Sequence, residues 1–250
     1  MAFGAIIIGD EIISGKRQDK HFPKVLEVLK QRGLDLAWCL YLGDDRQRLV
    51  DLLQRSLQSG EVVFSFGGIG VTPDDHTRQA VAAALGVSLE LHPDARREIE
   101  SRFGADTTPE RLMLGEFPAG SEIVPNPFNR IPGFSVRQHY FLPGFPEMAW
   151  PMMEWVLDTH CRHLHHAQPR AERALNVYCH GESRLLDLMQ GIEARFDGVK
   201  VFSLPAAHGT TPEPTIELGV KGSPLQVEEA IGEMRAELTQ RGIRWEDRTS

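Results

Sequence analysis

The sequence predicts an α/β protein in two parts: a three-layer α/β/α domain with a mostly parallel sheet, then a small α+β domain. Apolar strand-like runs alternate with amphipathic helices over the first 90 residues, the order that builds a parallel sheet covered on both faces. A second stretch of strands and helices follows residues 168–169. The chain has 250 residues, of which 41% are hydrophobic and 25% charged, as in ordinary globular proteins. We therefore expect domains over 1–167 and 168–250.

The first domain should begin with a strand over residues 3–8, a continuous apolar run of the kind covered on both faces of a sheet. Apolar side chains at helical spacing then predict a helix over 19–31. The same alternation continues with strands over 34–42 and 61–66 and helices over 45–59 and 72–85. Because strand–helix–strand units give parallel neighbours, this sheet should be mostly parallel.

Prolines interrupt the pattern beyond residue 90. We expect helices over 94–103 and 146–163, and strands over 121–124 and 134–142. Pro151 should kink the second of these helices or delay its start. In the second domain the expected strands are 171–179, 199–204 and 214–220, and the expected helices are 182–196 and 224–240.

Composition limits the compartment and the partners. The formal charge is −8 and no basic run occurs, so we expect no nucleic-acid partner. Three widely spaced cysteines give neither a disulfide framework nor a zinc knuckle and fit a reducing cytoplasm. No window reaches the roughly 20 apolar residues of a membrane span, so we expect a cytoplasmic protein without membrane contact. Exposed Met and Trp side chains on the 147–163 helix would suit a homodimer interface.

Glycine followed by carboxylates recurs where the first three strands end. The three segments are Gly9-Asp10-Glu11, Gly43-Asp44-Asp45 and the turn from Gly67 to Asp75. Ligands of such sheets bind outside the carboxyl ends of the strands, so these turns should meet at one edge. Hard cations take oxygen ligands, and we therefore expect Mg²⁺ or another divalent cation on Asp10, Glu11 and Asp75.

The third turn should hold a phosphate. Gly67, Gly68 and Gly70 permit positive φ and close approach of the backbone to a ligand. Thr72 could cap a helix with Pro73 at its first position, and free N–H groups there favour an anion. Asp74 and Arg78 complete the expected substrate-binding set, with Arg78 as a phosphate clamp. Alternatively, the two aspartates of the first turn only complement the helix dipole.

Three further motifs resemble known binding sites, but their details favour other interpretations. Residues 9–16 resemble a P-loop, but the glycine spacing is one residue too long and Arg17 replaces the Mg²⁺-binding hydroxyl. The glycine turn lacks the third glycine of a dinucleotide fingerprint. The histidine-rich segment 160–166 ends a helix, where histidines interact with the helix dipole; we favour this over a metal site.

Four motifs in order resemble the CinA-like branch of the molybdopterin-binding (MoaB/MogA) superfamily. They are GDEIISG (9–15), GGIGVTPDDHT (67–77), NPFNRIPGF (126–134) and FLPGFPEM (141–148), and the later GESRLLDL (181–188) looks like the small second domain of CinA-type proteins. The resemblance implies a molybdopterin-binding-like fold. Because the sequence ends near residue 250, we expect no C-terminal deamidase domain.

The resemblance also implies a function. In the MoaB/MogA branch, two aspartates that serve molybdopterin adenylylation match Asp44 and Asp75 here, which makes them the expected catalytic residues. The CinA-like branch is associated with metal-dependent cleavage of ADP-ribose or related pyrophosphates. The sequence departs from the family at Lys20-His21, Val71 and Arg130-Ile131, all bordering the expected pocket.

We therefore predict a domain that binds a phosphorylated small molecule, either a pterin such as molybdopterin or a nucleotide. Its expected activity is metal-dependent pyrophosphate hydrolysis of an ADP-ribose-like substrate. Two alternatives remain open: a non-catalytic molybdopterin- or nucleotide-binding module, and adenylyl transfer to molybdopterin in molybdenum cofactor biosynthesis.

Overall fold

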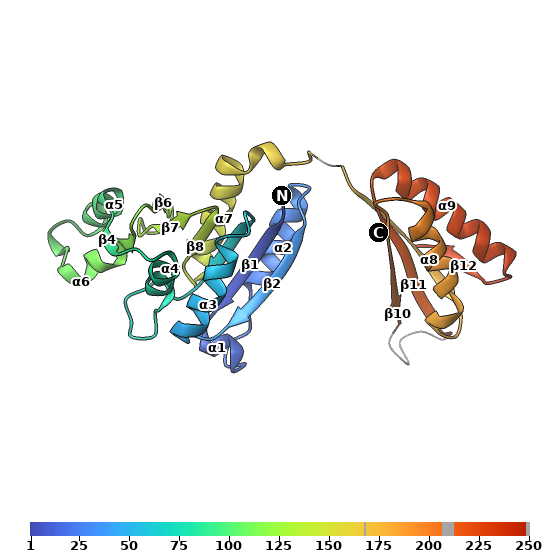
Figure 1. Cartoon of the computed structure of the whole chain (residues 1–250), viewed down its shortest axis with the longest axis horizontal. Helices are drawn as coiled ribbons and strands as arrows, with labels where there is room; N and C mark the ends of the chain where they lie inside the picture. Colours follow the sequence, from blue (N-terminus) through green and yellow to red (C-terminus); the bar gives the residue numbers. More distant parts are fainter. Residues whose placement is uncertain (168, 207–212, 249–250) are drawn as a thin grey trace. The chain divides into compact units, whose positions relative to one another are not determined.

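The computed structural model describes residues 1–167, 169–206 and 213–248 (Figure 1). The chain divides into two compact units, Met1–His165 (unit 1) and His166–Ser250 (unit 2). The observed boundary, between His165 and His166, lies two residues before the one expected between 167 and 168. Gln168 itself falls outside the described residues.

Unit 1 contains a six-stranded sheet in the order β2-β1-β3-β8-β7-β6. The first four strands in this order are parallel, and β7 and β6 complete the sheet in antiparallel pairing. The fold class predicted for this part, a mostly parallel sheet, is therefore confirmed. The strands are β1 (Phe3–Ile8), β2 (Leu36–Leu42), β3 (Val62–Phe66), β6 (Glu122–Val124), β7 (Gly133–Val136) and β8 (His139–Leu142).

Helices cover both faces of this sheet (Figure 1). On one face, α2 (His21–Gln31) and α7 (Pro146–His160) pack on Phe3 and Ile7 of β1. On the other face, α3 (Arg46–Ser56) and α4 (Thr77–Leu85) pack on Ile6 and Ile8. Alternate residues of one buried strand thus feed two separate cores, which explains why β1 is apolar throughout.

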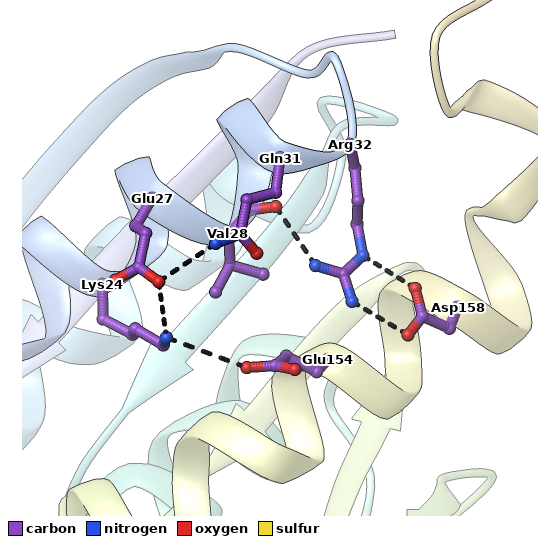
Figure 2. A network of polar contacts seen from close by, with 7 residues as sticks. All are labelled: Lys24, Glu27, Val28, Gln31, Arg32, Glu154 and Asp158. Carbon is purple, nitrogen blue, oxygen red and sulfur yellow. Dashed lines mark hydrogen bonds and ion pairs between the residues drawn. The ribbon is translucent and has the colours of Figure 1, made fainter.

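Ion pairs join α2 to α7 (Figure 2). Arg32 holds both carboxylate oxygens of Asp158, at 2.7 and 2.8 Å, and Lys24 lies 4.0 Å from Glu154. Met152 and Met153 of α7 are fully buried in the core, so neither is among the exposed side chains that could form a dimer face. Trp155 of α7 is exposed, at 36%. The homodimer stays a prediction.

Pro151 does not delay the start of α7, which begins at Pro146 and has Pro151 in its interior. A different correction concerns 134–142, where one expected strand is the hairpin of β7 and β8. Its turn residues Arg137 and Gln138 have φ of 49° and 61°, a left-handed geometry that glycine or asparagine usually signals. Neither glycine nor asparagine is present, so the sequence carries no signal for this turn.

Smaller elements complete unit 1. They are α1 (Asp10–Ile13), β4 (Leu89–Leu91), α5 (Pro93–Phe103), α6 (Pro109–Leu112), β5 (Glu116–Pro118), and 3₁₀ turns at Gly104–Asp106, Met113–Gly115 and Arg162–Leu164. Strands β4 and β5 pair with each other, apart from the main sheet.

Unit 2 is a four-stranded antiparallel sheet in the order β10-β11-β9-β12, with two helices and its own core. This confirms the small α+β part. Strand β12 was not predicted, because three residues carry no readable periodicity. The elements are β9 (Ala171–Tyr178), a 3₁₀ turn (Glu182–Arg184), α8 (Leu186–Arg195), β10 (Lys200–Pro205), β11 (Thr215–Gly222), α9 (Pro224–Gln240) and β12 (Trp245–Asp247). Across the described ranges, no helix combines the length and apolarity needed to cross a bilayer.

Candidate functional site

Loops that follow the parallel strands meet at one edge of the unit 1 sheet. The predicted turns after β1, β2 and β3 lie there, and so does the segment after β8, which is parallel to β3. Because β7 runs antiparallel to β8, the loop 125–132 that leads into β7 reaches the same edge. All four motifs of the sequence therefore converge here, although only three turns were expected.

Asp10 and Asp44 hold each other's main chain. The N–H of Asp10 donates to Oδ2 of Asp44 at 2.9 Å, and the N–H of Asp44 donates to Oδ1 of Asp10 at 3.1 Å. A Cβ on Gly43 would collide with Oδ1 of Asp10, so a side chain at this position would displace the Asp10 carboxylate from its bond to Asp44. The expectation that the first two turns meet is confirmed, and one oxygen of each carboxylate remains outside the reciprocal pair.

These two aspartates border a cleft of about 470 Å³. Its polar lining consists of four carboxylates and one lysine: Asp10, Glu11, Asp44, Asp74 and Lys16, beside Ser14. Burial raises the pKa of Asp44 above its usual range, and the neighbouring charges of the other three carboxylates raise it further. The cleft therefore concentrates negative charge, because its one lysine can offset only one of the four carboxylates.

Replacing Asp44 with asparagine should stabilise unit 1 slightly. The amide oxygen can still accept from Asp10, while the carboxylate repulsion is gone. Solvent screens the cleft, so we expect a gain below about 1 kcal/mol, or a rise in melting temperature of up to about 3 °C. A raised pKa in the folded state means that wild-type stability falls as the pH rises through the range between the unfolded and folded pKa values.

The gain from Asp44→Asn should therefore be present at pH 7 and vanish below about pH 4, where the carboxyl is protonated. Thermal melts at both pH values would measure it in a Trp245→Phe background, in which the three remaining tryptophans all lie in unit 1. Asp51→Asn, an exposed change on α3, is the matched control. A destabilised Asp44→Asn at pH 7 would contradict the charge argument.

The glycine turn has a different geometry from the one expected. Gly67 and Gly68 have φ of 102° and 68°, and a Cβ on Gly67 would collide with the carbonyl oxygen of Ile8. Helix α4 begins at Thr77 rather than Thr72, so Thr72 is not its cap. Within the described ranges, the N–H groups of Gly68, Ile69 and Gly70 donate no hydrogen bond. Free main-chain N–H groups in a glycine turn are typical of anion-binding sites.

Asp75 closes this turn. Its Oδ2 accepts from the N–H of Thr72 at 2.8 Å and from the Thr72 hydroxyl at 2.5 Å. The expected metal ligands Asp10, Glu11 and Asp75 are consequently not assembled as one set. Among the residues described, no three His, Cys, Asp or Glu side chains are grouped so that they could hold a metal ion, and this includes the histidines of 160–166.

Arg78 does not face the cleft. It is 2% exposed, and its guanidinium donates to three main-chain carbonyls: Gly70 at 2.6 Å, Glu116 at 3.0 Å, and Met113. Burial lowers its pKa. The expected phosphate clamp is instead a structural support that ties the glycine turn to the segment before β5, because every contact it makes points into the protein.

His21 belongs to the site and was missed as a functional candidate. It is 5% exposed, stacks on Phe66 with ring centroids 4.5 Å apart, and its Nε2 lies 3.1 Å from the carbonyl oxygen of Gly144. It thereby joins the end of β3 to the segment after β8. Burial lowers its pKa, which favours the neutral ring. The sequence signal was its place in the departure Lys20-His21.

Comparison with known proteins matches this geometry to a family. Residues 4–163 match the family described as "Probable molybdopterin binding domain". A "CinA-like protein" of Anaeromyxobacter sp. is 34% identical over 183 residues, which cover 70% of this chain and 44% of that protein. A "CinA-like protein" of Koribacter versatilis is 30% identical over 249 residues, or 93% of this chain and 58% of that protein. The chain thus spans about half the length of these relatives.

A solved structure shows the same fold. The protein CinA from Thermoplasma acidophilum, described as of unknown function, aligns with a TM-score of 0.57 at 24% identity, covering 63% of this chain and 98% of that one. The family match extends from β1 through α7 and takes in all the loops that form the site. This chain therefore belongs to the CinA-like branch of the molybdopterin-binding (MoaB/MogA) superfamily.

Proposed function

We propose that unit 1 binds a phosphorylated nucleotide or pterin at this sheet edge and hydrolyses its pyrophosphate bond, with an ADP-ribose-like molecule as substrate. The observation that carries the proposal is the reciprocal Asp10–Asp44 pair in a cleft lined by four carboxylates and one lysine. It lies on the same edge as a turn in which the main-chain N–H groups of Gly68–Gly70 donate no hydrogen bond within the described ranges. The carboxylates suit a cation, and the turn suits a phosphate.

The Asp10–Asp44 pair fits a divalent cation that is held partly by water and substrate, and not one that is enclosed by protein ligands alone. Mg²⁺ usually binds through one or two carboxylates, several waters and the phosphates of the substrate. Asp10 and Asp44 would hold it, with Glu11 or Asp74 close by. When bound, the ion would offset the repulsion between the cleft and an anionic substrate and polarise the phosphoryl group.

The chain's own groups would act on water and on the ligand. Asp44 accepts a proton from a water molecule through the carboxylate oxygen that does not bond to Asp10, as the oxygen of that water attacks phosphorus. The bridging P–O bond breaks, and ADP-ribose yields AMP and ribose 5-phosphate. The turn Gly68–Gly70 orients the phosphate through its main-chain N–H groups. Asp75 and Arg78 position that turn and do not touch the reacting atoms.

The test is release of AMP from ADP-ribose by the full chain with Mg²⁺, Mn²⁺ or Co²⁺. Asp44→Asn should lower kcat at least about 100-fold, the usual contribution of a general base. Asp10→Asn should also lower turnover, and Asp51→Asn should leave it unchanged. Turnover by Asp44→Asn at the wild-type rate would overturn the assigned role of Asp44.

A non-catalytic binding module is the second candidate. It is favoured by the arrangement of Asp75, which bonds to Thr72 and so leaves the expected three-carboxylate set unformed. Isothermal titration calorimetry separates the two candidates. Binding of ADP-ribose or a pterin phosphate, without product formation under any of the three metals, would identify the module.

A further inference from the structure

Two large aromatic side chains stand exposed at the edge that carries the site. Phe128 is 61% exposed and Phe145 is 56% exposed. Phe145 lies three residues after the end of β8, and Phe128 lies in the loop that leads into β7. The pairings of Val124 with Gly133 and of Phe134 with Phe141 bring both segments to the same edge of the sheet.

Phe145 follows Gly144, whose backbone lies close to the glycine turn. A Cβ on Gly144 would lie 3.5 Å from the Cα of Gly67. The hydrogen bond between Nε2 of His21 and the Gly144 carbonyl holds this segment in place, and His21 is in turn stacked on Phe66. The exposed ring of Phe145 is therefore carried by a segment whose backbone lies against the glycine turn.

Neither packing nor helix capping explains Phe145. It is the N-cap residue of α7, a position at which Ser, Thr, Asp or Asn would satisfy a free N–H group, and its side chain makes no capping bond. More than half of its surface is in water, so little of the ring contributes to the core. A local rule broken without structural gain is typical of a functional position.

The loop of Phe128 is built as firmly. Asn126 is 5% exposed and donates to Oδ1 of Asn129 at 2.8 Å and to the Ile131 carbonyl at 2.9 Å. Its own Oδ1 accepts from the N–H of Phe128 at 3.0 Å. Nδ2 of Asn129 reaches the sulfur of Met148 at 3.3 Å, in the first turn of the helix that Phe145 caps. The two aromatic loops are thus linked.

We infer that Phe128 and Phe145 form an aromatic platform for the planar heterocycle of the ligand whose phosphates occupy the glycine turn. The inference rests on the proposed function and deepens it. Aromatic side chains bind flat rings by stacking without reading their edges, so adenine and pterin both suit the platform. Affinity should then depend on the ring as well as on the phosphates.

Calorimetry with the full chain and Mg²⁺ tests this with four probes: ADP-ribose, AMP, a phosphorylated pterin and inorganic pyrophosphate. Phe145→Ala and Phe128→Ala should each raise the Kd of ring-bearing ligands about tenfold, as for loss of one stacking partner. The Kd of pyrophosphate should not change. Phe145→Trp should retain ring affinity, and Phe145→Leu should lose it, because leucine keeps the bulk but has no aromatic face.

Leu225→Ala, a 72% exposed change in unit 2, is the control. The probe that loses more affinity, AMP or the pterin, identifies the heterocycle. Wild-type affinity for ring-bearing ligands in both alanine variants would overturn the platform but leave the proposed function standing. Failure of the wild-type chain to bind ADP-ribose, the pterin and pyrophosphate would overturn both.

Discussion

Gly67→Ala is expected to destabilise unit 1 by about 2–5 kcal/mol, a large part of the stability of an ordinary domain. Two costs add. A φ of 102° is unfavourable for any residue with a Cβ, at about 1–2 kcal/mol, and overpacking a closed site costs about 1–3 kcal/mol. The atom that the new methyl group meets is the carbonyl oxygen of Ile8, which belongs to a fully buried strand and cannot move aside.

Urea denaturation in the Trp245→Phe background measures this loss without a signal from unit 2. Gly60→Ala separates the two costs, because Gly60 has a φ of 72° but nothing within 4 Å of its added Cβ. The control should therefore show only the cost of the backbone conformation, about 1–2 kcal/mol. Equal losses in the two variants would mean that the contact with Ile8 relaxes.

Arg78→Met should cost about 3–5 kcal/mol. The substitution keeps an unbranched apolar chain but leaves the carbonyl oxygens of Gly70, Met113 and Glu116 without their charged donor. Each such bond contributes more than a neutral one, and buried acceptors without a partner carry a desolvation penalty. Because Arg78 holds the glycine turn, phosphate affinity should fall together with stability.

Arg96→Met provides the contrast. Arg96 forms an exposed ion pair with Glu100 one helical turn away, and such pairs contribute only a few tenths of a kcal/mol. Denaturation midpoints of both variants, measured in the same Trp245→Phe background, would compare the two. A loss at Arg78 as small as that at Arg96 would show that water replaces the guanidinium, contrary to its burial.

The strands of unit 1 illustrate what a sequence reveals. Residues 3–8 were predicted to the residue, and 61–66 to within one, because every position of β1 and β3 is buried and nearly all of them are apolar, Ser65 being the polar exception. Proximity of Asp10 and Asp44 also followed, since it depends only on the parallel order of the strands. The hydrogen bonds from each main-chain N–H group to the other carboxylate could not be predicted, because they depend on how closely Gly43 lets the two loops approach.

The start of α4 shows where local rules fail. Thr72-Pro73 satisfies every preference for a helix start, yet the side chain of Asp75 takes the N–H of Thr72 and closes a turn instead. The role of Arg78 could not be predicted either, because it too depends on contacts that local sequence rules do not describe. Its carbonyl partners at 113 and 116 lie more than 30 residues away, and no spacing rule reports them.

The mutual bonds of Asp10 and Asp44 have a consequence for the evolution of the site. Each side chain supports the backbone of the other loop, so an apolar residue at either position removes the hydrogen bond that fixes the partner's N–H group. Asparagine is the one neighbour in chemistry that preserves both bonds while removing charge. Asparagine at either position would therefore keep the architecture of this edge while lowering the negative charge of the cleft, so structure and charge can change separately here.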